Sequence, residues 1–198
     1  MATASPEEVK PSAVDATEFR RALGHFATGV TVVTYQPEGT GLPWNTARHE
    51  DTDGEFRGVT VNSFTSVSLD PPLVLVSLGK KTRCAAALRP GRPFAVNVLH
   101  HGQRDLAMQF AGRPRPEAPV EWEVRSGVPH LAGCGAHFRC VTRDVHDAGD
   151  HVLVVGLVEE FQSAGHPPLL FYRGAFEDLP SRTVPAAAEA FIDFPELW

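Results

Sequence analysis

The chain has 198 residues, 42% of them hydrophobic, and a formal net charge of −6, which suits one compact domain with its own core. The negative charge and the absence of a basic stripe argue against a nucleic-acid-binding protein. No apolar run approaches the roughly 18 residues of a membrane helix. Residues 1–11 also lack the apolar segment of a signal peptide, so we expect no membrane contact.

The chain has an odd number of cysteines, and their spacing is not that of a disulfide framework: Cys84, Cys134 and Cys140. We therefore expect free thiols and a cytoplasmic location. Cys134, His137 and Cys140 invite comparison with a metal site. On one strand, however, His137 would point away from both cysteines, and no fourth ligand is evident. We expect no metal.

Residues 1–14 are polar, and we expect a flexible tail there. A helix should follow, because Asp15 and Glu18 have the spacing of a capping box. Four apolar residues then recur at the spacing of one helix face and predict a stripe that packs in the core: Phe19, Ala22, Leu23 and Phe26. Gly29 is expected to end this helix.

Six or seven segments have the Val-, Thr- and aromatic-rich composition of strands. They are residues 30–35, 58–68, 73–78, 93–99, 136–144, 151–161 and 169–172, with a turn at 146–150. The apolar run 73–78 is typical of a strand covered on both faces.

Short helices are expected at 82–88, with Thr82 as the N-cap, and at 103–110. The polar residues 36–56 predict a long loop or hairpin insertion, and residues 180–198 a C-terminal extension. Strands follow strands without regular helical crossovers. The sequence therefore predicts one mainly β (α+β) domain over residues 15–179, an antiparallel barrel with a few short flanking helices.

Residues 58–72 carry hydroxyl and amide side chains along a β-type segment. Such groups can donate and accept hydrogen bonds while the backbone stays in a sheet. A polar ring system such as isoalloxazine needs a wall of this kind. From composition alone, a solvated strand face explains the pattern equally well.

A second candidate is the segment 77–83, in which a glycine turn enters a helix beside Lys80, Lys81 and Arg83. Backbone N–H groups and cations at a helix start suit a phosphate, although a capped surface helix is the commoner explanation. A third is Gly149-Asp150-His151, a turn that would place a histidine beside a ligand. An ordinary hairpin turn is again the commoner explanation.

Two other enzyme classes lack their motifs. A serine hydrolase would need Gly-x-Ser-x-Gly between a strand and a helix, and the chain has none. Gly39-Thr40-Gly41 runs into Pro43 and lacks the third glycine of a dinucleotide-binding fingerprint.

In this order, the segments resemble the short-chain flavin reductase family, the reductase components of two-component flavin-dependent monooxygenases. That family is related to the FMN-binding split-barrel proteins. The matching segments are 19–34, 58–76, 94–112, 149–151 and 169–174. The resemblance implies a split β-barrel and a homodimer with each flavin site near the subunit interface. It also implies NADH or NADPH as donor, FMN, FAD or riboflavin as acceptor, and a partner monooxygenase that receives the reduced flavin.

The resemblance also assigns residues, with no catalytic acid or base required for hydride transfer. The flavin ring edge would contact Thr60, Val61, Asn62 and Ser63. The ribityl chain would lie near Ser66, Val67 and Ser68. The phosphate would lie near Ser77, Lys80, Thr82 and Arg83, with Asn97 buttressing the pocket. The nicotinamide half would contact His151, with Asp150, Tyr172 and Arg173 on the same side.

The chain departs from the family at two places. The link 36–56 is longer than usual, and Lys80 stands where the family often has serine.

Two other functions are compatible with the same pattern: a split-barrel protein that binds flavin without turnover, and a scaffold subunit with a degenerate pocket. Retention of Asn62, Ser66 and His151 argues against a degenerate pocket.

Overall fold

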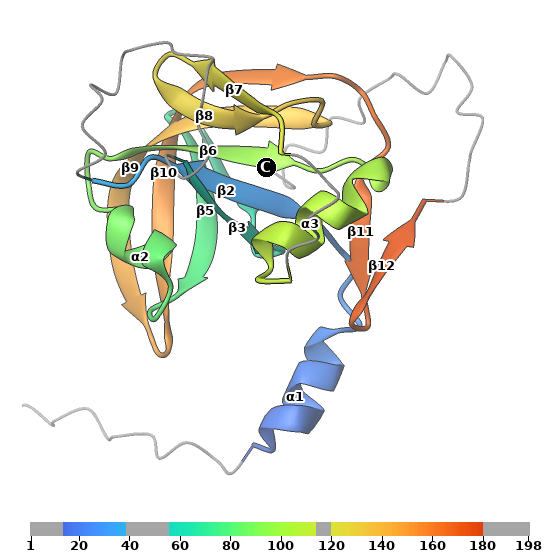
Figure 1. Ribbon diagram of the computed structural model, residues 1–198. Coiled ribbons are helices and arrows are strands. Elements are labelled where there is room, and N and C mark those ends of the chain that lie inside the picture. Colours follow the sequence, from blue (N-terminus) through green and yellow to red (C-terminus); the bar gives the residue numbers. More distant parts are fainter. Residues whose placement is uncertain (1–13, 39–55, 114–119, 180–198) are drawn as a thin grey trace, which may run out of the picture.

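The computed structural model describes residues 14–38, 56–113 and 120–179 (Figure 1). The predicted N-terminal tail, most of the predicted 36–56 insertion and the C-terminal extension lie outside these residues. Within the described ranges, no helix has the length and apolar character needed to cross a membrane.

A seven-stranded sheet, antiparallel throughout, curls into an open barrel (Figure 1). In sheet order its strands are β3 (Arg57–Val61), β2 (Thr31–Tyr35), β6 (Pro93–Val98), β9 (Ala136–Ala148), β10 (His151–Ser163), β5 (Pro72–Gly79) and β4 (Thr65–Leu69). The curl brings the end of β3 toward the end of β5. There the Ser63 hydroxyl donates to the Ser77 carbonyl at 2.9 Å and accepts from the Ser77 N–H at 3.0 Å. The predicted mainly β, antiparallel fold is confirmed.

Two small sheets complete the β-structure. One contains β1 (Thr28–Gly29), β11 (Leu169–Tyr172) and β12 (Ala175–Asp178), and the other is the hairpin of β7 (Trp122–Arg125) and β8 (Val128–Leu131). Of these strands, the sequence predicted β11 and none of the others. Each missed strand has two to four residues, which is too short for an alternating pattern to emerge.

The helices are α1 (Ala16–Leu23), α2 (Arg83–Ala87), the 3₁₀ turn η1 (His101–Gln103) and α3 (Arg104–Phe110). Both predicted N-caps are confirmed. The Asp15 carboxylate accepts from Thr17 N–H at 2.9 Å and Glu18 N–H at 2.8 Å. The Thr82 hydroxyl accepts from Ala85 N–H at 3.1 Å.

The prediction that α1 runs to Gly29 and packs a stripe in the core is wrong for the described chain. The helix ends at Leu23, because residues 28–29 leave to pair with β11. No residue of α1 is buried, and the side chains of Phe19, Leu23 and Phe26 are 53%, 56% and 78% exposed. The helix projects away from the barrel in Figure 1.

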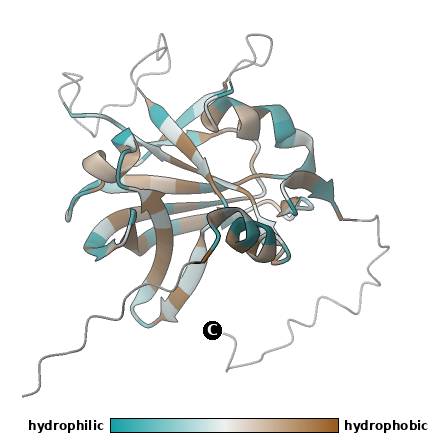
Figure 2. Cartoon of the chain, turned by 90° about the horizontal axis from the view of Figure 1, so that it is seen from below, coloured by the Kyte–Doolittle hydropathy of each residue, from teal (hydrophilic) through white to brown (hydrophobic). Residues whose placement is uncertain are grey.

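Alternating burial along β5 shows how the barrel core forms. Val74, Val76 and Leu78 are buried, whereas the residues between them are half-buried. The prediction of a strand fully covered on both faces is therefore wrong, because β5 turns only one face to the core. Figure 2 shows hydrophobic and hydrophilic bands following one another along several strands, as expected where one face of a sheet is buried.

The β9–β10 hairpin extends further than the sequence predicted. β9 continues to Ala148, so the turn contains only Gly149 and Asp150 rather than residues 146–150. Gly149 has φ +67°, a conformation that a residue without Cβ adopts freely. The tight turn fixes where the start of β10 lies.

All three cysteines are free and buried. Burial raises the pKa of each thiol to about 12, which leaves them unreactive at neutral pH. Cys134 and Cys140 belong to different core clusters. Across the described ranges, no three His, Cys, Asp or Glu side chains are grouped to hold a metal.

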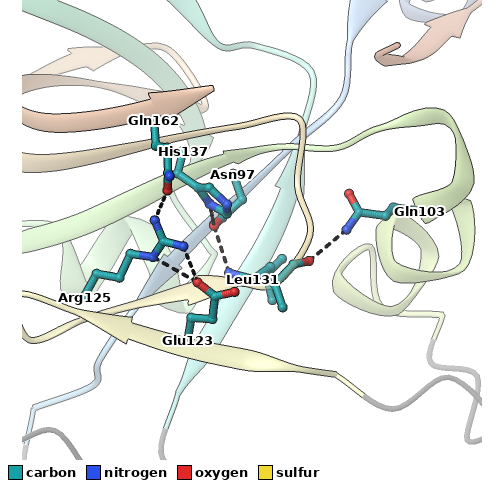
Figure 3. A network of polar contacts seen from close by, with 8 residues as sticks. Asn97, Gln103, Glu123, Arg125, Leu131, His137 and Gln162 are labelled. Carbon is teal, nitrogen blue, oxygen red and sulfur yellow. Dashed lines mark hydrogen bonds and ion pairs between the residues drawn. The ribbon is translucent and has the colours of Figure 1, made fainter. Parts of the chain in front are cut away.

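A buried amide ties the barrel to the β7–β8 hairpin (Figure 3). Asn97 is fully buried. Its Nδ2 donates to the Val32 carbonyl and the Thr34 hydroxyl, both at 2.9 Å. Its Oδ1 accepts from Leu131 N–H at 2.9 Å and lies 3.1 Å from Nδ1 of His137. The Asn97 side chain thus satisfies hydrogen-bonding groups on β2, β8 and β9.

Replacing Asn97 with alanine should lower the free energy of unfolding by about 3 kcal/mol, because several buried polar groups lose their partner together. Chemical denaturation measures the change. Asn62→Ala, at an exposed position, is the matched control and should unfold like the wild type. Equal stability of the Asn97 variant would contradict the role assigned to the network.

Protonation of His130 should destabilise the fold in mild acid. The ring is 2% exposed and both nitrogens lack a partner within the described structure. Burial, with the nearby charges of His137 and Arg125, lowers its pKa to about 4. The unfolded chain takes up this proton below its ordinary pKa of about 6.5, so stability should fall between about pH 6.5 and pH 4 by up to about 3 kcal/mol.

His130→Phe removes no hydrogen bond and should lose less stability on acidification than the wild type. Denaturation at about pH 7 and about pH 5 measures the difference. Parallel losses in the two proteins would show that His130 is not responsible.

Candidate functional site

A pocket of about 360 Å³ opens where the ends of β3 and β5 meet the start of β10. Its walls come from residues 59–63, residues 77–79, Thr82 and His151. Three segments distant in sequence, 59–63, 77–82 and the start of β10, therefore form one groove, to which we refer as the barrel groove.

The pairing of β5 with β10 places His151 at the barrel groove. His151 lies opposite Gly79 in the antiparallel register. The backbone N–H of Lys80 donates to the Asp150 carbonyl at 3.0 Å, which holds the hairpin turn against the end of β5. Because Gly79 has no side chain, the groove stays open between His151 and Thr82.

Most hydroxyls of the barrel groove serve its own structure. Thr60 donates to the Ala107 carbonyl at 2.7 Å, which ties β3 to α3. Thr82 donates to the Gly79 carbonyl at 2.8 Å, and Ser63 joins Ser77 as described above. Asn62 differs, because it is exposed and bonds to no residue of the described ranges. Its amide is the group with both donors and acceptor left for a ligand.

His151 is oriented by its neighbour Asp150. The Asp150 carboxylate lies 2.7 Å from Nδ1 of His151. The hydrogen bond and charge of His151 lower the pKa of Asp150. A Cβ placed on Gly79 would lie 3.9 Å from Nε2 of His151. The second ring nitrogen therefore faces the groove.

A smaller hollow of about 190 Å³ adjoins the barrel groove on the other side of residues 60–62. Val30, Ala111, Phe171 and Phe176 complete its walls. The two hollows share Thr60, Val61 and Asn62, so a polar edge lies beside an apolar extension.

The structure brings seven of the predicted site residues into the barrel groove. They are Thr60, Val61, Asn62, Ser63, Ser77, Thr82 and His151. Asp150 contacts His151 directly. These residues come from both the predicted flavin half and the predicted nicotinamide half.

Other predicted residues lie outside the groove walls. Ser66, Val67 and Ser68 are on the edge strand β4. Lys80 forms an ion pair with Asp147 on β9, and Arg83 is exposed at the start of α2.

Asn97, Tyr172 and Arg173 also lie elsewhere. Asn97 is in the interior network of Figure 3. Tyr172 and Arg173 lie at the β11–β12 turn beside α1, where the Arg173 N–H donates to the Gly24 carbonyl at 2.9 Å.

Sequence reasoning missed Val59, Leu78 and Gly79 as groove residues. Val59 and Leu78 are ordinary strand residues with no chemical signal. Gly79 carried a signal, because a glycine between a strand and a helix often marks a close approach to a ligand.

Residues 23–180 match the family model described as "Flavin reductase like domain". The chain belongs to this family. The match covers most of the chain and includes every residue of the barrel groove, so the resemblance stated from the sequence is confirmed.

Relatives and solved structures agree with the family match. An NADH-dependent flavin reductase of Rhodococcus sp. is 39% identical over 177 residues, 89% of this chain and 93% of that protein. The reductase subunit HsaB of a flavin-dependent monooxygenase from Rhodococcus jostii is 37% identical over 182 residues, 90% and 86% of the two chains. The NADH:FAD oxidoreductase SgcE6 of Streptomyces globisporus, solved in complex with NAD and FAD fragments, has a TM-score of 0.70, 34% identity, and coverage of 85% and 95%.

The barrel groove has the chemistry that a flavin requires. Isoalloxazine is planar, with apolar faces and polar edges. Val59 and Val61 can supply apolar contact, and the free amide of Asn62 can meet a polar edge. Gly79 leaves space that a larger side chain would fill.

Replacing Gly79 with leucine should block flavin binding without unfolding the protein. A Cβ at this position meets Thr82 Cγ2 at 3.7 Å and His151 Nε2 at 3.9 Å, which are ordinary contacts, but the rest of a leucine would occupy the groove. Gly79→Ala is the matched control. We expect flavin affinity to fall at least about tenfold for leucine and little for alanine, measured by flavin fluorescence titration. Unchanged affinity in a folded leucine variant would place the flavin elsewhere.

Proposed function

We propose that this protein is an NADH-dependent flavin reductase that transfers a hydride from the reduced nicotinamide to FMN or FAD. The observation that carries the proposal is the barrel groove itself, in which the free amide of Asn62 and the oriented ring of His151 line one opening beside Gly79. The relatives named above support NADH as the donor and a flavin as the acceptor.

The two bound molecules supply the redox chemistry, and the protein supplies position and electrostatics. Holding two reactants in contact contributes up to about 7–11 kcal/mol to lowering a barrier. Rigid walls suit this task. The hydroxyls of Thr60, Ser63 and Thr82 donate hydrogen bonds to backbone carbonyls, which makes the walls rigid. No acid or base in the protein needs to exchange a proton during hydride transfer.

Contacts are proposed for the predicted site residues in and beside the groove. Asn62, with the backbone of Thr60, Val61 and Ser63, meets the flavin ring edge. The residues of β4, namely Ser66, Val67 and Ser68, lie near the ribityl chain. His151, held by Asp150, contacts the nicotinamide side.

Lys80 and Arg83 are proposed to hold the flavin phosphate, with Thr82 lining the groove beside it. Lys80 is engaged with Asp147, whose side chain is 77% exposed. An ion pair this exposed to water contributes about 0–1 kcal/mol to the stability of the fold. A phosphate can therefore replace the Asp147 carboxylate as the partner of Lys80. Asn97 supports the groove indirectly, since Val32, which its amide bonds, lies opposite Thr60 in the sheet.

The reduced flavin is proposed to serve a partner monooxygenase, as the name of the HsaB relative indicates for that protein. A cytoplasmic location is proposed from the three free, buried cysteines. A flavin-binding protein without turnover is the alternative function, and kinetic assays separate it from a reductase.

Steady-state assays that combine NADH or NADPH with FMN, FAD or riboflavin test the proposed activity. We expect nicotinamide oxidation that requires both a donor and a flavin. Tight flavin binding without any oxidation would favour the non-catalytic alternative and contradict the proposal.

His151→Ala should raise the KM for NADH about tenfold and lower kcat, because one contact that orients the nicotinamide is lost. Flavin affinity should change little. His146→Ala, which removes an exposed histidine of the same hairpin, is the matched control. Unchanged KM and kcat in the His151 variant would remove this residue from the site.

A homodimer is proposed because α1 presents an uncovered apolar face. An isolated helix of eight residues is not stable in water without packing, and Phe19, Leu23 and Phe26 are more than half exposed. A second copy of the chain would cover this face, as the family resemblance implies.

The double substitution of Phe19 and Leu23 by serine should shift the protein toward monomer in sedimentation velocity experiments. Phe161→Ser, at an exposed phenylalanine of β10, is the comparison. Dissociation by the Phe161 change and not by the α1 change would contradict an interface at α1.

A further inference from the structure

A hollow of about 310 Å³ lies between the β7–β8 hairpin and the open end of the β9–β10 hairpin, away from its turn. Arg125 and His130 line it from the first hairpin, and His137, Arg139 and Phe161 are among the residues that line it from the second. We refer to this space as the hairpin hollow.

The hairpin hollow is a separate site from the barrel groove. The barrel groove contacts the start of β10 at His151, whereas the hairpin hollow contacts residues 160–162 near the end of the same strand. At about 3.3 Å per residue, about 30 Å of strand lies between the two. Within the described ranges, no residue lines both spaces. An occupant of the hairpin hollow is therefore a further ligand, beyond the two reactants of the proposed reductase.

Two side chains of the hairpin hollow carry buried polar atoms without a partner. The ring of His130 is almost fully buried, and neither of its nitrogens forms a hydrogen bond in the described part of the chain. Nε of Arg139 is also buried and unpartnered there, although Nη1 of the same side chain pairs with Glu159. Leaving such groups unsatisfied is costly, and in native proteins they commonly bind a water, an ion or a ligand.

The neighbouring polar side chains are already bonded to the protein (Figure 3). Nδ1 of His137 donates to Oδ1 of Asn97 at 3.1 Å, because an amide oxygen only accepts. Nε of Arg125 donates to Glu123 at 2.9 Å, and its Nη1 donates to Gln162. These bonds hold the walls in place around the two unpartnered groups.

A β-bulge in β10 limits the positive charge at the hairpin hollow. In the β9–β10 register Arg139 lies opposite Glu160 and Cys140 lies opposite Val158, so Glu159 is an extra residue. Glu159 pairs with Arg139, and Glu160 lines the hollow. Because these two carboxylates repel negative charge, a singly charged anion suits the hollow better than a doubly charged one.

Phe161 gives the hairpin hollow an aromatic wall. Its ring stacks on the ring of Phe138 with centroids 6.3 Å apart, and its side chain is 73% exposed. One face of the Phe161 ring is thus packed, and the other is open to a planar apolar group. The volume of the hollow is near the lower end of the usual range for ligand pockets, about 300–1,000 Å³. A small ligand with one flat apolar part therefore fits.

We propose that the hairpin hollow binds a small aromatic carboxylate, with the carboxylate at Arg139 and His130 and the ring against Phe161. Nε of Arg139 and one ring nitrogen of His130 each donate a hydrogen bond to the carboxylate, and the first of these bonds is charge-assisted. The occupant satisfies the buried groups that the described chain leaves without a partner. This site goes beyond the proposed reductase function and does not depend on it.

The protonation state of His130 gives the site a pH dependence. Burial lowers the pKa of His130 to about 4, so the free ring is neutral near pH 7. A carboxylate bound beside the ring favours its charged form. Binding should therefore take up protons, and affinity should rise as the pH falls from about 7 to about 5, where a carboxyl group is still ionised. The charged and titratable groups around the ring and the hollow come from three strands: Glu123 and Arg125 of β7, His137 and Arg139 of β9, and Glu159 and Glu160 of β10.

The test uses benzoate as the probe in calorimetry on the full-length protein. Benzamide has the same ring without the charge, acetate has the charge without the ring, and inorganic sulfate is a doubly charged anion. The variants are His130→Phe and Arg139→Gln. Arg143→Gln, at an exposed arginine of β9, is the matched control for loss of charge.

We expect benzoate to bind the wild type and the Arg143 variant equally, and to bind His130→Phe and Arg139→Gln at least about tenfold more weakly. Benzamide and sulfate should bind the wild type more weakly than benzoate. Calorimetry at about pH 5.5 in two buffers of different ionisation enthalpy should show proton uptake by the wild type and none by His130→Phe.

A further variant covers the case in which a buried substitution unfolds the protein, which circular dichroism reports. Phe161→Ser changes an exposed side chain and should lower the affinity for benzoate toward that for acetate, while acetate binding stays the same. Proton uptake by the wild type needs no variant at all.

The proposal is overturned if benzoate does not bind the wild type at millimolar concentration, or if folded His130 and Arg139 variants bind it as the wild type does. Binding without proton uptake, or sulfate binding tighter than benzoate binding, would also overturn it. Weaker flavin binding by a folded Arg139→Gln variant would assign the hollow to the flavin instead. Benzoate binding in a protein that reduces no flavin would leave this site standing while the reductase function fails.

Discussion

The antiparallel register between β5 and β10 is the constraint on which the site depends. It places His151 opposite Gly79 and brings this histidine to the wall that carries Ser77. A slip of one residue would turn every side chain of β10 to the other face of the sheet. The tight Gly149–Asp150 turn and the bond from Lys80 N–H to the Asp150 carbonyl fix this register at the end nearest the groove.

The polar side chains of the barrel groove fall into two groups, those bonded to the backbone and those that face the opening. Thr60, Ser63 and Thr82 satisfy backbone groups and make the walls rigid, whereas Asn62 and the second nitrogen of His151 face the opening. Because the two reacting molecules bring their own chemistry, a rigid opening with a few free polar groups is sufficient protein machinery.

The sequence predicted what local chemistry determines. Asp15 and Thr82 cap helices as expected, and the hydroxyl-rich segment 58–72 supplies much of the groove. It did not predict features set by distant partners. Asn97 looked like a pocket residue, yet its bonds reach β2 and β8. The apolar stripe of α1 was predicted to pack in the core of this chain. An amphipathic pattern, however, does not indicate whether the apolar face packs against the same chain or against another.

A crystal structure of the protein with bound FMN would show whether the barrel groove holds the flavin. We expect the isoalloxazine ring in the barrel groove, with its edge at Asn62 and one face open toward His151. A different hollow of about 310 Å³, lined in part by Arg92, Arg139 and Glu159, lies further along β10 from His151. Flavin bound there, with the space between Gly79, Thr82 and His151 closed by protein side chains, would show that the barrel groove is not the flavin site.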